Sequence, residues 1–287
     1  MKNILLLLSM IITIGVYGQS KSYDYAYMNK KGICVYSVAD KKEVLITKKG
    51  QDPYISPDGK KLAYSSSNDK GDRFIDVVDL NTRRKIILNT QNNNSYGPVW
   101  SPDGGLIAYN SFDSKNAKWY IALIDSGNTN LRILTGQIEN SYVPSWLANS
   151  QNVVAQNLDN VYVVNLSGDI IKSYKIADLS KAMGASSSDR FIFTDDNKKI
   201  VFSEDVDEPG ESDGPPSAVF VYDIANKSTL RLSPKGYFAN EVFVKGNKVL
   251  FTASKLNSRV QNVFSVDVNG KNFKVLFPGC SSVSAKR

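Results

Sequence analysis

Two segments of the chain carry one pattern: ISPDGKKLAYSS at residues 55–66 and WSPDGGLIAYNS at residues 100–111. The central Ser-Pro-Asp-Gly fits a β-turn, because proline fixes φ at the second position and glycine is favoured at the fourth. The aromatic and β-branched runs on both sides are typical of strands. The copies lie about 45 residues apart, the repeat length of a four-stranded propeller blade.

Weaker copies of the pattern follow at residues 145–150, 193–203 and 242–251, where parts of the Pro-Asp-Gly turn are lost but the strand-forming residues remain. With the two clear copies they predict five blades, which begin near Pro53, Pro98, Pro144, Asp189 and Glu241.

The two ends of the chain complete the count. Residues 23–28, 33–38 and 43–47 supply three strands without an innermost one, and residues 278–285 stand where a further innermost strand should begin. We therefore expect an all-β, six-bladed β-propeller of four-stranded antiparallel blades, in which the C-terminal strand closes blade 1. Closure removes the open edges of a linear array. A repeat solenoid without closure is the alternative.

The first residues are typical of a secretory signal peptide. Met1-Lys2-Asn3 is a short basic start, residues 4–16 are almost wholly apolar, and Gly18 offers a small residue for cleavage. The apolar run is shorter than the roughly 20 residues of a membrane span, although a membrane anchor is the alternative. We expect a signal peptide over residues 1–18, one propeller domain over residues 19–287, and a bacterial protein that is periplasmic or secreted.

The chain contains no histidine. This excludes Ser-His-Asp and Cys-His nucleophile systems and metals bound by histidine. The formal net charge of +7 comes from short basic pairs scattered along the chain, such as Lys60-Lys61. Scattered charge and export both argue against a nucleic-acid partner.

Cys34 and Cys280 are the two cysteines, and a disulfide is common in exported proteins. Cys34 is expected in the third strand of blade 1, and Cys280 just before its first strand. Neighbouring strands lie about 4.8 Å apart, so first and third strands stand roughly 9–10 Å apart, beyond the roughly 7 Å between Cα atoms that a disulfide tolerates. We therefore favour two separate thiols over a bridge.

The run PVWSPDGGLIAYNS at residues 98–111 resembles the blade repeat of the TolB-like β-propellers, and residues 53–66 are similar, with Ile55 in place of tryptophan. The resemblance covers nearly the whole chain after the signal peptide. It implies a WD40-like propeller of the cell envelope that stands alone, without the N-terminal α/β domain of the family's namesake. Related propellers gate prolyl oligopeptidase-type peptidases, but the Gly-x-Ser-x-Gly turn and histidine of those enzymes are absent here.

Tyrosines near the expected pore mouth are the first candidate site. The rim residues are Asn94, Tyr96, Asn140, Tyr142 and Tyr237. Tyrosine offers a flat apolar surface with a polar tip, which suits peptides and sugars. Packing between neighbouring blades explains the same rings without a ligand. Trp100, Trp119 and Trp146 are expected in the core between blades, and a short helical turn is expected within residues 178–188.

An acidic loop between the second and third strands of blade 5 is the second candidate. Its carboxylates are Glu204, Asp205, Asp207, Glu208, Glu211 and Asp213. Clustered carboxylates could bind Ca²⁺, but the spacing does not match an EF-hand. We therefore favour a solvated loop that docks a positively charged partner, with a Ca²⁺ site as the alternative.

These features predict a non-enzymatic, monomeric binding or scaffolding propeller that needs no cofactor. Its partner would be an envelope or extracellular protein, peptide or glycan, held at the rim or in the central pore. The alternative is a carbohydrate-active hydrolase or lyase that works with paired carboxylates in the pore.

Overall fold

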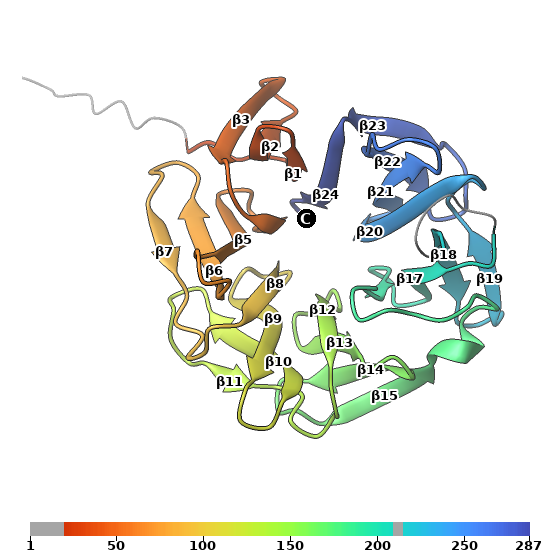
Figure 1. Cartoon of the computed structure of the whole chain (residues 1–287), viewed down its shortest axis with the longest axis horizontal. Helices are drawn as coiled ribbons and strands as arrows, with labels where there is room; N and C mark the ends of the chain where they lie inside the picture. The colour runs from red at the N-terminus through yellow and green to blue at the C-terminus, as the bar shows by residue number, and fades with distance from the viewer. Residues whose placement is uncertain (1–19, 209–214) are drawn as a thin grey trace, which may run out of the picture.

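The computed structural model describes residues 20–208 and 215–287. The expected signal peptide therefore lies outside the described residues. Six four-stranded antiparallel sheets surround a central axis, as Figure 1 shows. The predicted six-bladed β-propeller is confirmed. Among the described residues no helix is long and apolar enough to cross a bilayer. The helical turn expected over residues 178–188 forms slightly earlier, as the 3-10 helix η1 (Ile176–Asp178).

The four strands of each blade follow one another outward from the central axis. From the innermost strand outward, blade 1 consists of β24 (Cys280–Ala285), β1 (Tyr25–Asn29), β2 (Gly32–Ser37) and β3 (Lys42–Thr47). Blade 2 consists of β4 (Gln51–Ile55), β5 (Lys61–Ser67), β6 (Arg73–Asp79) and β7 (Lys85–Ile87). Blade 3 consists of β8 (Ser95–Trp100), β9 (Leu106–Asp113), β10 (Lys118–Asp125) and β11 (Arg132–Ile133).

The second half of the ring repeats this order. Blade 4 consists of β12 (Tyr142–Trp146), β13 (Asn152–Gln156), β14 (Asn160–Asn165) and β15 (Ile170–Lys175). Blade 5 consists of β16 (Ile192–Phe193), β17 (Lys199–Asp205), β18 (Ser217–Asp223) and β19 (Ser228–Arg231). Blade 6 consists of β20 (Tyr237–Lys245), β21 (Lys248–Lys255), β22 (Asn262–Asp267) and β23 (Lys274–Pro278).

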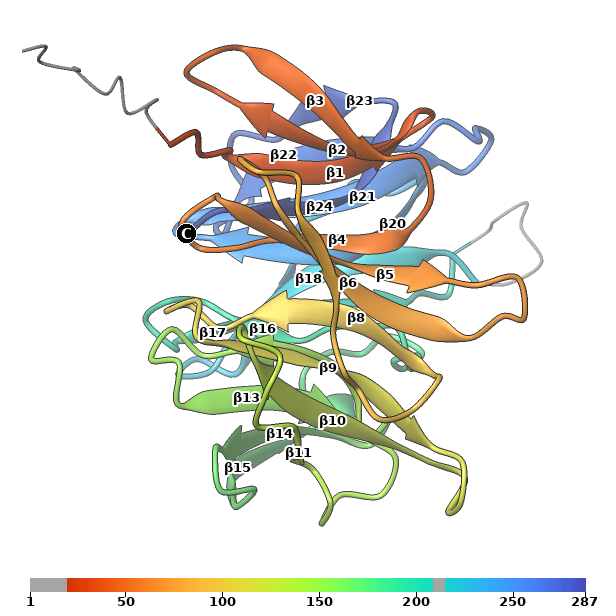
Figure 2. The ribbon, with the colours of Figure 1, turned by 90° about the vertical axis from the view of Figure 1, so that its left-hand side faces the viewer.

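The ring closes through strands from both ends of the chain. β24 pairs antiparallel with β1, with Tyr25 opposite Ala285 and Asn29 opposite Cys280. Figure 2 shows the two strands side by side. The predicted closure of blade 1 is therefore confirmed. Cys280 is the first residue of β24, so the expectation that it precedes the strand is wrong by a small margin.

Apolar side chains pack mainly between neighbouring blades. One cluster joins Ile75 and Val77 of blade 2 to Ile107 and Tyr109 of blade 3. Two tryptophans also connect neighbouring blades by hydrogen bonds, since each indole N–H donates to a backbone carbonyl of the preceding blade. Trp100 donates to Tyr54 at 3.1 Å, and Trp146 donates to Val99 at 3.2 Å. Trp100 and Trp146 are buried as expected.

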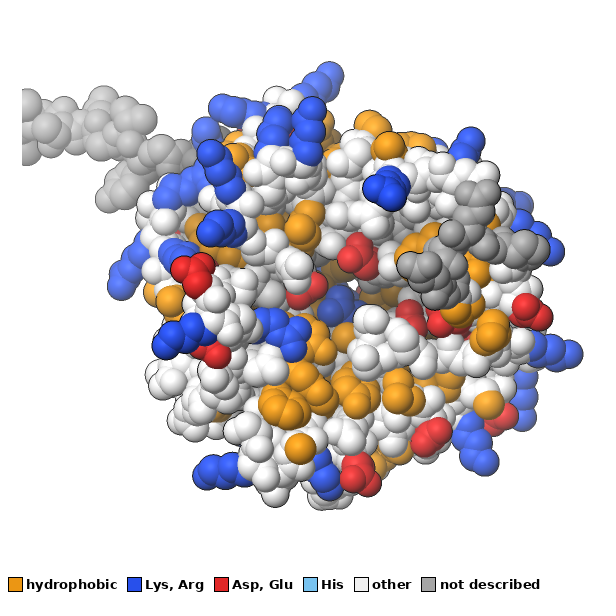
Figure 3. All heavy atoms as spheres, in the orientation of Figure 1, with side chains coloured by type: hydrophobic (Ala, Val, Ile, Leu, Met, Phe, Trp, Pro, Cys, Tyr) orange, Lys and Arg blue, Asp and Glu red, His pale blue; other side chains and the backbone are white. Residues whose placement is uncertain are grey.

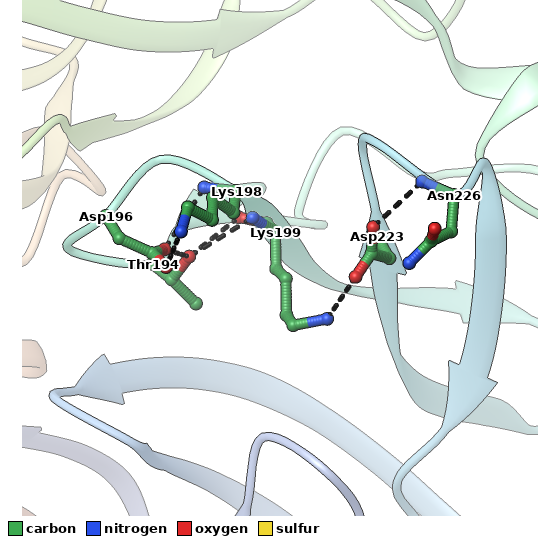
Figure 4. A network of polar contacts seen from close by, with 6 residues as sticks. All are labelled: Thr194, Asp196, Lys198, Lys199, Asp223 and Asn226. Carbon is green, nitrogen blue, oxygen red and sulfur yellow. Dashed lines mark hydrogen bonds and ion pairs between the residues drawn. The ribbon is translucent and has the colours of Figure 1, made fainter.

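The repeated turn has a fixed hydrogen-bond pattern. In blade 2 the Ser56 hydroxyl donates to Asp58 at 2.6 Å, and it accepts the Lys61 backbone N–H at 2.8 Å. In blade 5 Thr194 replaces the serine and donates to Asp196 at 2.6 Å, as Figure 4 shows.

Asn197 takes the left-handed conformation there, with φ +57°, where Gly59 has +71°. The turn chemistry therefore survives the loss of the proline and the glycine, because asparagine tolerates this conformation. Beside the turn, Lys199 forms an ion pair with Asp223.

Candidate functional site at the central channel

The innermost strands share an irregularity that faces the channel. In five blades the pairing with the second strand shifts at the same register, so that two residues of the innermost strand oppose one residue of its neighbour. A β-bulge of this kind re-aims a side chain. The first residue of each bulge is Asp52, Gly97, Val143, Glu241 or Ser282.

These five residues all have positive φ values, from +40° at Val143 to +65° at Gly97. Positive φ is uncommon outside glycine and exceptional for a β-branched residue. Such strain persists only where the surroundings enforce it, and it gathers at functional sites. Its recurrence at one register of five blades shows that the channel wall is built on backbone that most residues disfavour.

Arg190 takes the corresponding place in blade 5. Phe193 pairs with Ile200 as Trp100 pairs with Ile107. Arg190 lies three residues before Phe193, and Gly97 lies three residues before Trp100. The two residues therefore occupy equivalent positions in their blades. We call Ser282, Asp52, Gly97, Val143, Arg190 and Glu241 the bulge ring, in the order of blades 1 to 6.

Polar side chains of the second strands hold three of the bulges in place from the neighbouring blade. The Ser65 hydroxyl accepts the Gly97 N–H at 2.8 Å. The Asn110 side-chain oxygen accepts the Val143 N–H at 2.8 Å, and the Thr252 hydroxyl accepts the Ser282 N–H at 3.0 Å. These contacts satisfy backbone donors that the irregular pairing would otherwise leave buried and unpaired.

The bulge ring surrounds a cavity of about 160 Å³. Figure 3 shows the hollow at the centre of the ring, where both acidic and basic side chains are visible. The cavity is lined by the bulge ring and by Pro53, Tyr54, Tyr96, Pro98, Ser188, Val242 and Val283. Its wall therefore combines three charged groups with hydroxyls and two tyrosine rings.

The two carboxylates of the bulge ring are bound to neighbouring groups. Asp52 accepts the Ser65 hydroxyl at 2.7 Å. Both oxygens of Glu241 accept from Ser282, one from its backbone N–H and one from its hydroxyl, each at 2.9 Å. Burial raises the pKa of Tyr54 above its usual range, so this side chain stays a neutral hydroxyl at physiological pH.

An aromatic cluster stands beside the channel mouth. The Tyr96 and Trp119 rings meet edge to face, with centroids 5.3 Å apart, and Phe112 lies 4.9 Å from Trp119. The Arg73 guanidinium lies 3.9 Å from the Tyr96 ring centroid. All three rings are partly exposed, and in Figure 3 hydrophobic side chains gather below the hollow, over blades 3 and 4. We call Tyr96, Phe112 and Trp119 the aromatic platform.

Trp119 therefore departs from the expectation that it is a core residue. It lies near the start of β10, where the strand leaves the packed region between blades, so one side of its ring stays open. Tyr96 and Tyr142 occupy equivalent registers, opposite Asn110 and Gln156.

Tyr237 does not share this register. Asn240 stands there instead, opposite Thr252, because β20 extends further beyond its bulge than the other innermost strands. The Tyr237 ring packs edge to face on Phe264, with centroids 5.7 Å apart. The rim asparagines have local partners: Asn94 accepts from the Arg73 Nε at 2.7 Å and Asn140 accepts the Trp119 backbone N–H at 3.1 Å.

The acidic segment is divided between a strand and a loop. Glu204 and Asp205 belong to β17, since pairing with β18 continues to Asp205 opposite Ser217. The expectation that both lie in the loop is therefore wrong. Glu208 forms an ion pair with Arg231, and Asp207 is exposed. Glu211 and Asp213 lie outside the described residues. Within the described part of the chain no group of acidic or cysteine side chains is placed to hold a metal ion.

Glu204 is 1% exposed. One of its oxygens accepts the Ser180 hydroxyl, and the other has no hydrogen-bond partner. Burial, together with the charges of Asp189 and Asp205, raises the pKa of Glu204 to about 7. This carboxyl ties the connection between blades 4 and 5 to β17.

Cys34 and Cys280 are both buried free thiols. β1 separates their strands, because it pairs with β2 on one side and with β24 on the other. Burial raises the pKa of Cys280 to about 11.

No family model matches the chain, and no curated protein matches it in sequence. Solved structures do match its fold. A protein described as TolB from Agrobacterium tumefaciens is 18% identical, with a TM-score of 0.63 over 90% of this chain and 91% of that one. The fold is a TolB-like propeller.

Two further structures show the same ring. TolB from Acinetobacter baumannii is 17% identical, with a TM-score of 0.68 over 92% of this chain and 66% of that one. A puromycin-hydrolyzing peptidase from Mycobacterium tuberculosis is 15% identical, with a TM-score of 0.57 over 89% of this chain and 44% of that one. Proteins of different function thus share the propeller, and the likeness establishes the fold alone.

Asp52, Arg190 and Glu241 are site residues that the sequence patterns did not single out. The one available signal was their shared distance from the repeated turn. That distance places all three at the position of Gly97 in the clearest copy of the motif.

Proposed function

We propose that this protein is an exported, non-enzymatic binding propeller that receives a segment of a protein partner at the channel mouth. The observation that carries the proposal is the junction of the bulge ring with the aromatic platform. Tyr96, a member of the aromatic platform, makes this junction, since it precedes Gly97 of the bulge ring, lines the cavity and packs on Trp119. Tyrosine, tryptophan and arginine are the residues that most often dominate binding energy at protein interfaces.

The size of the cavity supports a narrow ligand. A volume of about 160 Å³ suits a short extended segment, while the remainder of a partner would lie over the rim. Hydroxyls and carboxylates in the wall can pair with peptide N–H groups. Rigid rings beside them supply contact area at a low cost in side-chain entropy.

A capture experiment tests this proposal. Residues 19–287 would be immobilised and exposed to envelope extract, and retained proteins identified by mass spectrometry. We expect a partner that is lost on Trp119→Ala and kept on Ile171→Ala, which removes an exposed hydrophobic side chain (59% exposed) from the outermost strand of blade 4. Thermal melts of both variants would show that they are folded.

Recovery of no partner by the wild-type chain would refute the proposal. Capture of a glycan in place of a protein would also refute it in this form. Export is tested separately, by N-terminal sequencing of the protein from the periplasmic and extracellular fractions, where a chain that starts at Gln19 is expected.

A carbohydrate-active enzyme is the second candidate, because Asp52 and Glu241 both line the cavity. Glycoside hydrolysis needs two carboxyl groups about 5–10 Å apart. The hydrogen bonds of Glu241 favour the binding role, since both of its oxygens hold the Ser282 bulge. Turnover of an envelope polysaccharide that disappears on Glu241→Gln and Asp52→Asn would instead establish the enzyme.

A further inference from the structure

Arg190 is the cationic member of the bulge ring, and its guanidinium has no hydrogen bond or ion pair with any residue that the structure describes. Its Nε is buried and unpartnered. This sets it apart from Arg231, which pairs with Glu208, and from Arg73, whose Nε donates to Asn94. The guanidinium of Arg190 therefore offers N–H donors that no described residue accepts.

The fork of Arg190 extends into the channel. One terminal nitrogen lies 4.0 Å from the point where a β-carbon on Gly97 would stand. Arg190 belongs to blade 5 and Gly97 to blade 3, so the side chain reaches over the cavity. Glycine at the blade 3 bulge leaves that space open, and both residues line the cavity.

The two carboxylates of the same ring are hydrogen-bonded to other groups. Asp52 is bound to Ser65 and Glu241 to Ser282, and neither forms an ion pair with Arg190. In the ring order blade 2 stands opposite blade 5, so Asp52 and Arg190 face each other across the channel. A ligand between them would meet a donor fork on one side and an acceptor on the other.

We propose that Arg190 binds a carboxylate of the inserted segment, while Asp52 accepts an N–H of the same segment. Arginine and a carboxylate form two parallel charge-assisted hydrogen bonds, which fix orientation as well as adding energy. The two acidic members of the ring repel a dianion more than a monoanion, so the wall favours a carboxylate over a phosphate. This inference rests on the proposed function, because it names the group that the channel receives.

Two sources can supply the carboxylate: the C-terminus of a chain, or an Asp or Glu side chain. The probes are therefore N-acetylglycylglycine, which mimics a C-terminus, and N-acetylaspartate amide, which mimics a side chain. N-acetylglycylglycine amide and inorganic phosphate are the controls. NMR of the ¹⁵N-labelled protein follows the arginine Nε–H signals, and Arg190 is assigned as the signal that disappears in Arg190→Gln. The backbone amide signals of the same protein report probe binding in the variants that lack the arginine.

We expect at least one carboxylate probe to shift the Arg190 signal in a saturable way, and the tighter of the two identifies the source. Arg190→Gln should weaken binding at least about tenfold, as for loss of a charged hydrogen bond. Arg190→Lys keeps the charge without the fork and should fall between Arg190→Gln and wild type. Arg132→Gln, an exposed arginine of β11, should bind like wild type.

An equal shift with the amide control, tighter binding of phosphate, or unchanged affinity in both Arg190 variants would overturn the inference. Capture of a partner by a chain that ignores both carboxylate probes would refute the inference and leave the proposed function standing. Carboxylate binding by a chain that captures no partner would refute the proposed function and leave Arg190 as a residue that binds carboxylates.

Discussion

The Ser284 hydroxyl accepts a hydrogen bond from the backbone N–H of Ile55 at 3.0 Å, although the two residues are 229 positions apart. The contact joins the innermost strands of blades 1 and 2 and is buried. β24 therefore contacts two blades: it pairs with β1 inside blade 1, and through Ser284 it is bonded to β4 of blade 2. The ends of the chain are therefore structural partners.

Removal of residues 280–287 should abolish cooperative unfolding. It deletes β24, exposes the edge of β1 and uncovers the cluster that contains Tyr27 and Phe243. Differential scanning calorimetry would show a broad transition or none. Deletion of residues 286–287 alone is the control and should keep a sharp transition. A chain without β24 that melts as sharply and as hot as the intact one would contradict the closure.

Ser284→Ala, a milder change, should lower the free energy of unfolding by about 1–3 kcal/mol, because it leaves the buried N–H of Ile55 unpaired.

Gly97→Ala should destabilise the protein by about 1–2 kcal/mol, the cost of left-handed backbone for an L-residue. Gly97 has φ +65°, and an added methyl group would stand 2.9 Å from the Asn110 amide nitrogen. Urea unfolding measures the change. Gly136→Ala is the matched control, since its β-carbon would meet open space. If the two substitutions cost the same, the bulge at position 97 tolerates a β-carbon and does not require glycine.

Stability should fall as pH rises from about 4.5 to about 7 through the titration of Glu204. The folded state raises its pKa from 4.5 to about 7, so in this window the folded protein keeps a proton that the unfolded chain has lost. A shift of this size corresponds to roughly 3 kcal/mol. Glu204→Gln, which stays neutral, should remove most of this pH dependence in urea unfolding.

Glu139→Gln is the control for that measurement, because Glu139 is an exposed carboxylate. It should leave the slope unchanged. Asp189, whose pKa burial also raises, should account for a remaining slope of the same sign. A wild-type protein whose stability rises across this window would rule out a protonated Glu204.

Both thiols should resist modification in the folded protein. Cys34 and Cys280 are buried and have raised pKa values, and the thiolate is the reactive form. A colorimetric thiol reagent at pH 8 should react slowly with the native chain and should count two thiols per chain in denaturant without reductant. A count of zero under those conditions would show that the two cysteines are bridged.

Much of the fold could be predicted from the repeated turn, because serine, proline, aspartate and glycine each meet a local demand that needs no knowledge of the neighbours. The closure by β24 could be predicted from the missing innermost strand of blade 1. Even the degraded turn at Thr194 was recognisable, since its residues form the same bonds as Ser56 and Asp58 do in blade 2.

The bulge ring could not be predicted in this way. A bulge is a property of how two strands pair, and the residues at its first position, from Val143 to Glu241, share no chemistry. Tyr237 looked like Tyr96 by position before a strand, but β20 is extended beyond its bulge, so the register differs by three residues. Trp119 looked like a core residue because it is a large aromatic residue within a strand. Its exposure depends on where β10 leaves the layer packed between blades, which the sequence does not show.

The bulges form with side chains of unrelated chemistry, and this has an evolutionary consequence. Gly97, Val143 and Ser282 are held through their backbone N–H groups by side chains on the second strands, so the identity of each can change while the neighbouring blades stay in register. A lineage can therefore exchange the lining of the pore one position at a time and acquire a new specificity without rebuilding the scaffold.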